Sequence, residues 1–211
     1  GKTIIKTINR FSGIDWGTEN IAIAYDYWWN TRNRKAYLFN PSDFKKQTKI
    51  IYDRNYQDVY SDPGIFMKSR NEFNKNVLTI HSGYTFLNGP GFTKDGQFPF
   101  IDKVNLSNLS KQRIYQSTYT NKLESIQDYD PDNKKLIVRI ESPTEFPNYY
   151  TKKINSSRLN QITDFKNPFV QLQNIHKKVI TYKRDDGLEL SGVLYLPLNR
   201  HDVNYLLNEN L

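Results

Sequence analysis

A strand–turn–strand unit that recurs three times constrains the fold of this chain more than any other feature. In each unit a short apolar run ends at an Asn-centred turn, and a second short apolar run follows. The anchor residues are Asn40, Asn105 and Asn155, so the spacings are 65 and then 50 residues. Repeats of about 40 to 50 residues built from antiparallel strands are typical of β-propeller blades. A β-sandwich whose hairpins look alike is the alternative that this spacing leaves open.

The longer first interval contains a stretch, residues 86–96, that is rich in Gly and Pro. Glycine and proline at this density interrupt regular structure. We therefore expect a long loop between strands there, inserted into an otherwise regular repeat.

Strand patterns run through the whole chain, and helical periodicity is hard to find. The clearest runs are short, β-branched or aromatic, and bounded by turn residues; they lie at 21–25, 49–52, 77–80, 136–140 and 193–196. Aromatic residues make up 14% of the chain, which favours folded, strand-rich structure over disorder. The sequence therefore predicts an all-β fold: a partial β-propeller of about three blades, followed by a β-hairpin.

The repeat ends near Phe165. We predict propeller blades over residues 1–165, and a linker with the start of another domain over residues 166–211. Within the second segment, Asp186-Gly187 separates two strand-like runs. This dipeptide predicts a hairpin with a type I′ turn, because that turn needs positive φ at its central residues.

Four aromatic residues, Tyr25, Tyr27, Trp28 and Trp29, lie close together at the end of the first strand-like run. They could form a stacking platform for a sugar or a peptide. We favour the alternative that they fill space between blades, because aromatic residues at strand ends often do so.

Four stretches carry long and distinctive motifs: 14–32, 52–63, 139–150 and 175–197. The last of them resembles the segment that opens the α/β-hydrolase domain in serine peptidases of the prolyl oligopeptidase family. The upstream stretches are most similar to the glutamyl endopeptidase branch of that family. The resemblance implies the C-terminal part of a β-propeller together with the first hairpin of the hydrolase domain.

In such enzymes the propeller caps a serine hydrolase and selects peptide substrates by size. The chemistry needs a Ser on a Gly-x-Ser-x-Gly elbow, with a His and an Asp. That motif does not occur in this sequence, and 14 residues follow Pro197. We therefore expect no catalytic residue and no cofactor here. The partners implied are a peptide substrate and the missing hydrolase domain, and the chain should be inactive alone. The resemblance favours a periplasmic or secreted location.

A free-standing propeller-like module that binds a peptide, a glycan or a protein is the alternative function. In either case, blades at the ends of a partial propeller expose unpaired strand edges. Such edges pair readily with other strands, so self-association is expected.

Arginine side chains are the candidates for substrate binding. In the resembling branch the residue before the cleaved bond is acidic, and a guanidinium fork holds a carboxylate best. Arg70 and Arg139 could point into the channel, and Glu141 is the third candidate. The alternative is that each arginine pairs with a neighbouring carboxylate, such as Glu141, and holds blades together.

The remaining charged residues favour neither a metal nor a nucleic acid. Asp53, Asp58, Asp62, Glu141 and Glu145 fit no EF-hand spacing, and His81, His176 and His201 share no ligand-like spacing. The chain has no Cys, so disulfides are excluded. The net charge of +8 comes from scattered basic pairs, typical of a solvated surface. No run approaches the roughly 18 apolar residues of a membrane span.

Overall fold

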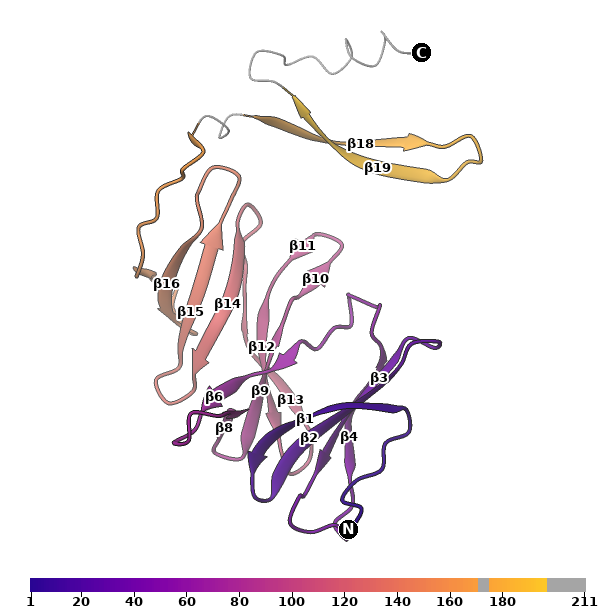
Figure 1. Cartoon of the computed structure of the whole chain (residues 1–211). Helices are drawn as coiled ribbons and strands as arrows, with labels where there is room; N and C mark the ends of the chain where they lie inside the picture. Colours follow the sequence, from indigo (N-terminus) through magenta and orange to yellow (C-terminus); the bar gives the residue numbers. More distant parts are fainter. Residues whose placement is uncertain (171–174, 197–211) are drawn as a thin grey trace. The chain divides into compact units, whose positions relative to one another are not determined.

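The computed structural model describes residues 1–170 and 175–196. All assigned elements in these residues are β-strands, arranged as antiparallel sheets (Figure 1). Among them no helix is long and apolar enough to cross a membrane. The chain forms two compact units: residues 1–142 with 147–165, and residues 143–146 with the chain from 166 onward.

The first sheet, indigo to violet in Figure 1, is a meander in which strands adjacent in sequence are paired. Its order is β1 (Arg10–Thr18), β2 (Ile21–Trp28), β3 (Asn33–Phe39) and β4 (Lys49–Asn55). The third sheet repeats this pattern with β14 (Leu123–Asp130), β15 (Lys135–Glu141), β16 (Asn148–Lys153) and β17 (Asn160–Gln161).

The second sheet is also antiparallel, but one of its edges is divided between two short strands. Its long strands are β9 (Tyr84–Gly89), β12 (Phe100–Asn105) and β13 (Lys111–Gln116). Two short strands, β5 (Ile65–Phe66) and β8 (Ile80–His81), pair with different parts of β9.

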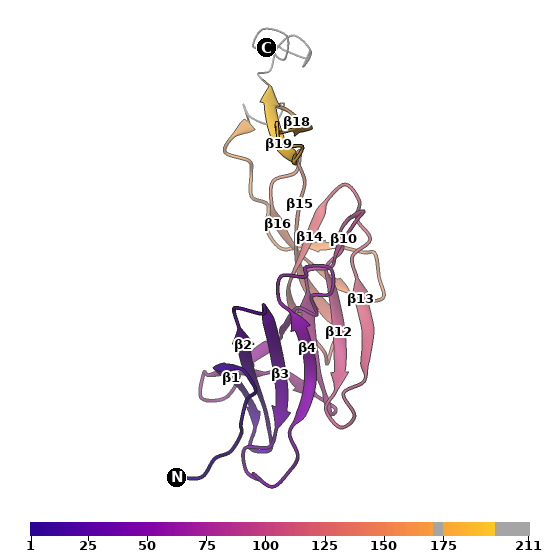
Figure 2. The same ribbon diagram turned by 90° about the vertical axis from the view of Figure 1, so that its right-hand side faces the viewer.

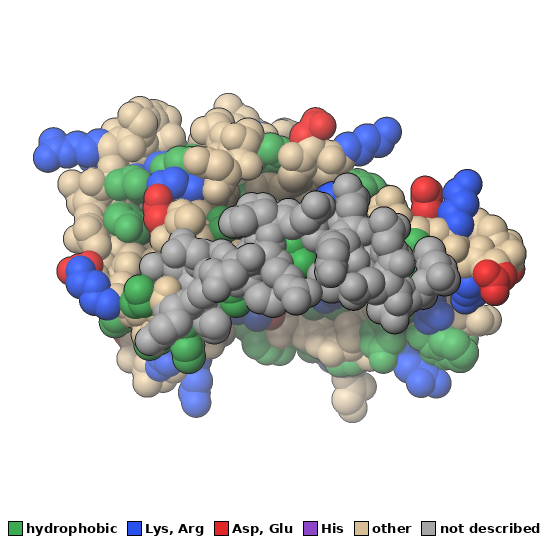
Figure 3. Space-filling model, turned by 90° about the horizontal axis from the view of Figure 1, so that it is seen from above, with side chains coloured by type: hydrophobic (Ala, Val, Ile, Leu, Met, Phe, Trp, Pro, Cys, Tyr) green, Lys and Arg blue, Asp and Glu red, His purple; other side chains and the backbone are tan. Residues whose placement is uncertain are grey.

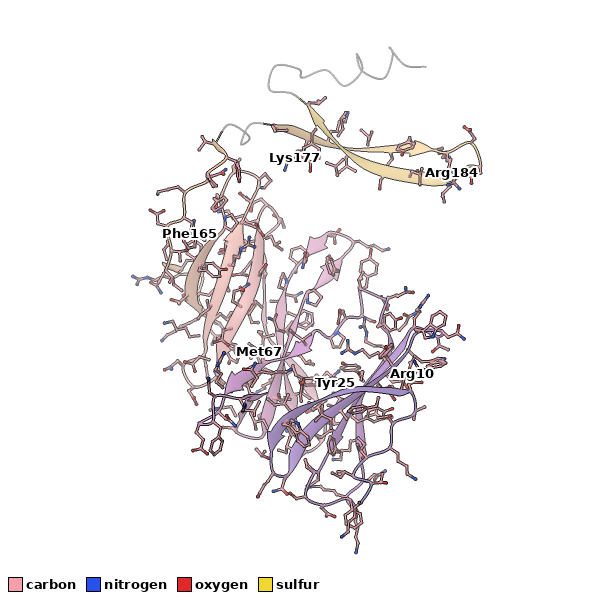
Figure 4. All side chains as sticks on the ribbon, viewed as in Figure 1. Arg10, Tyr25, Met67, Phe165, Lys177 and Arg184 are labelled. Carbon is pink, nitrogen blue, oxygen red and sulfur yellow. The ribbon has the colours of Figure 1, made fainter. Side chains whose placement is uncertain are left out.

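A hairpin leaves this divided edge between its two halves. It consists of β6 (Lys68–Arg70) and β7 (Asn76–Leu78). The strand predicted at 77–80 is therefore interrupted at Thr79, whose N–H donates to the Met67 carbonyl (2.9 Å). The hairpin begins beside Met67, which Figure 4 labels.

The three Asn anchors lie close to the end of the third strand of each sheet: Asn40 follows β3, Asn105 is the last residue of β12, and Asn155 lies two residues beyond β16. The Asn40 Oδ1 accepts from the N–H groups of Ser42 (2.8 Å) and Asp43 (3.0 Å). In the second sheet the Asn105 Oδ1 accepts from the Ser107 N–H (2.8 Å). After β16 the turn is closed instead by the backbone, with Ser156 N–H donating to the Lys153 carbonyl (3.1 Å). The predicted all-β, blade-like repeat is confirmed.

Two apolar interfaces hold the three sheets together, and the second sheet takes part in both. On β9, Phe86 belongs to the interface with the third sheet, whereas its neighbour Leu87 belongs to the interface with the first. Because successive strand residues point to opposite faces, this sheet is buried on both sides. The ring of Phe86 meets Tyr129 edge-on, with centroids 5.2 Å apart. Figure 2 shows the first and second sheets in succession.

The Gly/Pro-rich stretch 86–96 is not the long loop that its composition predicts. Its first part is the buried end of β9, and only the remainder leaves the sheet, as a small hairpin of β10 (Phe92–Thr93) and β11 (Gly96–Gln97). Gly89 serves packing, since a Cβ there would lie 2.1 Å from the Phe100 Cζ. The glycine therefore leaves room for an aromatic ring on the paired strand.

The second unit contains the predicted hairpin, β18 (His176–Lys183) with β19 (Glu189–Leu196). Its turn differs from the predicted type I′ form. Gly187 has positive φ (84°), whereas Asp186 does not. The Gly187 N–H donates to the Arg184 carbonyl (2.8 Å), and the Arg184 N–H donates to the Leu188 carbonyl (2.9 Å). This is the three-residue loop in which a left-handed glycine follows an ordinary turn.

Candidate functional site

A cleft of about 860 Å³ lies where the first sheet, the divided edge of the second sheet and β14 of the third sheet come together. An adjoining cavity of about 540 Å³ shares Arg34, Tyr52 and Asn88 with it. Pockets of this size suit small ligands or short peptide segments. All lining residues belong to the first compact unit.

Strand register places the polar side chains of this cleft. Arg34 on β3 is paired with Tyr27 on β2 and with Arg54 on β4. The same face of β3 continues with Ala36 and Leu38, which pack into the interface with the second sheet. The inner face of the first sheet thus changes from apolar to cationic where it enters the cleft.

The two arginines differ in their surroundings. The Arg54 Nη1 lies 3.5 Å from the Asp62 Oδ1, and its Nη2 donates to the Asp58 carbonyl. Arg34 is exposed and lies over the Tyr25 ring, 5.4 Å from the centroid. Within residues 1–170 and 175–196, its guanidinium forms neither a hydrogen bond nor an ion pair with a protein group. Arg34 is therefore a cation without a matching anion.

Tyr25 and Tyr52 line the adjoining cavity together with Arg34. The Tyr25 hydroxyl donates to the Asp15 Oδ2 (2.7 Å), and the Asp15 Oδ1 also binds Lys68 Nζ (2.6 Å). Burial, helped by Asp15, raises the pKa of Tyr25 well above its usual value. Burial also raises the pKa of Tyr52, against the opposing effect of Arg34 and Arg54. These phenols therefore stay neutral near pH 7 and can donate hydrogen bonds.

The arginines singled out from the sequence lie outside both cavities. Arg70 is exposed on β6 and donates to Asn74 across the hairpin. Arg139 forms a two-pronged ion pair with Glu141 on the same strand, at 2.6 and 3.0 Å. The expected pairing of an arginine with Glu141 is thus present within one strand. A role in substrate binding for Arg70, Arg139 and Glu141 stays a prediction.

Arg34 carries no signal in the sequence that separates it from a surface charge, because other basic residues, Arg32 and Lys35, flank it at the start of β3. Arg34 is distinguished by two features of the three-dimensional structure: β3 pairs with β4, and the second sheet lies close to this part of β3.

The aromatic cluster is divided between core and surface. Tyr25, labelled in Figure 4, packs against the interface of the first two sheets, as a space-filling role predicts. Tyr27 and Trp29 are instead 41% and 56% exposed, so the space-filling interpretation is wrong for them. Arg32 lies over the Trp29 ring, 5.6 Å from the centroid.

The acidic and histidine candidates have structural partners. Asp53 binds Lys35, the Asp58 Oδ1 accepts from the Tyr60 N–H (3.0 Å), and the His81 Nδ1 lies 3.0 Å from the Asp132 Oδ1. His201 and the His176 side chain lie outside the described part. In that described part, no group of three His, Cys, Asp or Glu side chains could hold a metal ion.

Basic side chains are spread over the surface. Among the residues drawn in colour on the face seen in Figure 3, they stand at separate points. Several are matched within the sheets, as when Arg113 binds both oxygens of Asp102 (2.8 and 3.2 Å).

Comparison with known proteins connects the chain to peptidases. It is 33% identical over 202 residues to the "Probable glutamyl endopeptidase, chloroplastic" of Oryza sativa subsp. japonica, covering 89% of this chain and 22% of that protein. The protein of the same name from Arabidopsis thaliana is 32% identical over 203 residues, covering 89% of this chain and 21% of the relative. The predicted resemblance to glutamyl endopeptidases is confirmed, and the chain spans about a fifth of the length of these relatives.

Solved structures give weaker likenesses. TolB from Acinetobacter baumannii matches with a TM-score of 0.40 at 14% identity, over 92% of this chain and 43% of that chain. The AtxE2 isopeptidase without ligand matches with a TM-score of 0.33 at 11% identity, over 94% of this chain and 40% of that chain. No protein-family model matches the chain.

Proposed function

We propose that this chain is the non-catalytic, substrate-selecting part of a serine peptidase of the glutamyl endopeptidase type. The observation that carries the proposal is the identity of 33% over 202 residues, almost the whole chain, with a relative of which it spans 22%. Three blade-like sheets and a cleft along their edges suit a role in admitting and holding peptides. Hydrolysis would belong to residues outside this chain, since the nucleophile elbow motif does not occur in its sequence.

The test is activity of the purified 211-residue chain. We expect no labelling by a fluorophosphonate probe, which reacts with activated serines, and no cleavage of Glu-containing peptides. Labelling that is lost after mutation of a single Ser would overturn the proposal. A bacterial serine hydrolase treated in parallel controls for probe quality.

A free-standing binding module for a peptide, glycan or protein is a second candidate. The exposed rings of Tyr27 and Trp29 favour it, because aromatic faces serve such binding sites. The two functions differ in the size of the cellular protein. An antibody raised against this chain should detect a much larger polypeptide in extracts if it is part of a peptidase. A species no larger than 211 residues favours the module.

A further inference from the structure

We propose that a cavity of about 600 Å³, here called the turn cavity, binds a small organic anion with an apolar body, such as a medium-chain carboxylate. Its lining includes Leu38 on β3 and Tyr84 on β9, each near one end of its strand. The cleft lies at the other ends of the same strands, where Arg34 and Gly89 line it. Among the described residues, the turn cavity shares no lining residue with the cleft or with the adjoining cavity. A ligand there is therefore not required by the proposed function and goes beyond it.

Turns from the first and second sheets form the walls of the turn cavity. Two of the repeated anchors, Asn40 and Asn105, line it together with Asn20 from the turn between β1 and β2. The Asn40 Nδ2 donates to the Asn20 Oδ1 (3.3 Å). Lys49 Nζ donates to the Ser107 carbonyl, and this bond ties the first sheet to the second. The walls are thus held in place by contacts within the protein, before any ligand binds.

The turn between β8 and β9 adds a further wall in an uncommon backbone conformation. Ser82 has a φ of 50°, in the left-handed region that residues other than glycine seldom occupy. The Gly83 carbonyl accepts from the Leu106 N–H (3.0 Å), which holds this turn against the end of β12. Such a conformation persists only where the surrounding contacts determine it. This side of the turn cavity is therefore also preformed.

The charged side chains that line the turn cavity are both cations. They are Lys46 and Lys49, and no carboxylate belongs to the lining among the residues that the structure describes. Neither lysine forms an ion pair with another described residue. The carboxylate of Glu19, beside the lining residue Asn20, accepts from the Asn20 Nδ2 (3.1 Å) instead. The turn cavity therefore has an excess of positive charge, which attracts an anion.

Apolar side chains determine what kind of anion suits the turn cavity. Ile21, Leu38 and Leu106 are half-buried in its lining, and Leu38 also packs against the interface of the first two sheets. Covering apolar surface stabilises a complex by about 25 cal/mol per Å². An inorganic anion would leave this surface uncovered, and a neutral hydrocarbon would leave both lysines without a counter-ion. A carboxylate with a chain of several carbon atoms satisfies both, and the volume is in the usual range for small-ligand pockets.

The experiment titrates octanoate, octanamide and acetate into the isotopically labelled 211-residue chain and follows amide chemical shifts. Octanamide has the same carbon chain without the charge, and acetate has the charge with almost no chain. We expect octanoate to shift the residues that line the turn cavity and to bind at least about 5-fold more tightly than either of the other two. Lys46→Gln should weaken octanoate binding by about 2- to 5-fold, the contribution of one exposed ion pair.

Lys45→Gln is the matched control, because Lys45 is the exposed neighbour of Lys46 and lies outside the lining of the turn cavity. This variant should bind octanoate as the parent chain does, and thermal midpoints establish that each variant is folded. The proposal is overturned if octanoate shifts no residue of the lining, if octanamide binds as tightly, or if Lys46→Gln binds octanoate as tightly as Lys45→Gln does. Shifts confined to the cleft, at Arg34 and Tyr52, would also overturn it.

Discussion

Lys152 and Glu124 form an ion pair inside the interface between the second and third sheets, with Nζ 3.2 Å from Oε1. Both residues are buried, Glu124 at 1% exposure and Lys152 at 7%. Tyr115 on β13 links them to the neighbouring sheet: Lys152 donates to its hydroxyl (2.8 Å), and that hydroxyl donates to the other oxygen of Glu124. A polar cluster therefore fixes the docking of two otherwise apolar faces.

Removing the cation from this cluster should destabilise the fold strongly. Lys152→Met keeps the length of the side chain but leaves the buried Glu124 carboxylate without its counter-ion. Loss of one member of a buried pair costs about 3–5 kcal/mol, measurable as a lower free energy of unfolding in urea. The adjacent, exposed Lys153→Met should change stability by less than about 0.5 kcal/mol. Equal effects of the two substitutions would contradict this role.

The double variant Glu124→Gln with Lys152→Met tests whether the loss of stability in Lys152→Met comes from the unpaired Glu124 carboxylate. It removes both charges, so the cost of an unpaired buried carboxylate disappears. We expect it to be more stable than Lys152→Met alone. A double variant less stable than either single variant would show that the charges matter independently of each other.

Local sequence patterns predicted where most of the strands and turns lie, because these positions depend on nearby residues. Asn40 and Asn105 could be found as turn anchors since each side chain binds N–H groups two residues on. Contacts between sheets could not be found in this way. Gly89 looked like a loop residue because the ring it accommodates, Phe100, lies on another strand.

The candidate site was missed for the same reason. Arg34 is distinguished by what surrounds it in three dimensions, namely Arg54 on the next strand and the edge of the second sheet. Arg139 has a local partner, Glu141, two residues away, and a local pattern could anticipate that pair. Interactions between residues of one strand can thus be predicted from the sequence, whereas interactions that depend on how the sheets pack cannot.

The contact between Gly89 and Phe100 can be tested by adding one methyl group. A Cβ at residue 89 would lie 2.1 Å from the Phe100 ring, so Gly89→Ala forces the ring or β9 to move. Overpacking of this kind costs about 1–3 kcal/mol, measured by thermal or urea unfolding. Gly13→Ala is the control, since a Cβ there meets nothing within 4 Å. Adding Phe100→Leu should recover part of the loss; no recovery would assign the effect to the backbone.

Alkaline pH should destabilise the first sheet through Tyr37. Burial and its hydrogen bond to Asp26 raise the pKa of this phenol to about 12, whereas an unfolded tyrosine titrates near pH 10. Between these values the folded state holds a proton that the unfolded state has lost, so stability falls as pH rises from about 10 to about 12. Tyr37→Phe should flatten this decline in the free energy of unfolding. Tyr60→Phe, at an exposed position, should leave the slope of the parent chain unchanged.

Open sheet edges should make the chain self-associate. The outer strand of the first sheet, β4, pairs on one side only, with β3, and carries Ile50 at 47% exposure. An unpaired strand with an exposed apolar residue is a template for a second strand. We expect sedimentation velocity to show oligomers that increase with concentration, and Ile50→Lys to reduce them, because a charge on an edge strand opposes pairing. Ser156→Lys, which adds the same charge in a turn, should not reduce them. A monomer at every concentration would contradict this expectation.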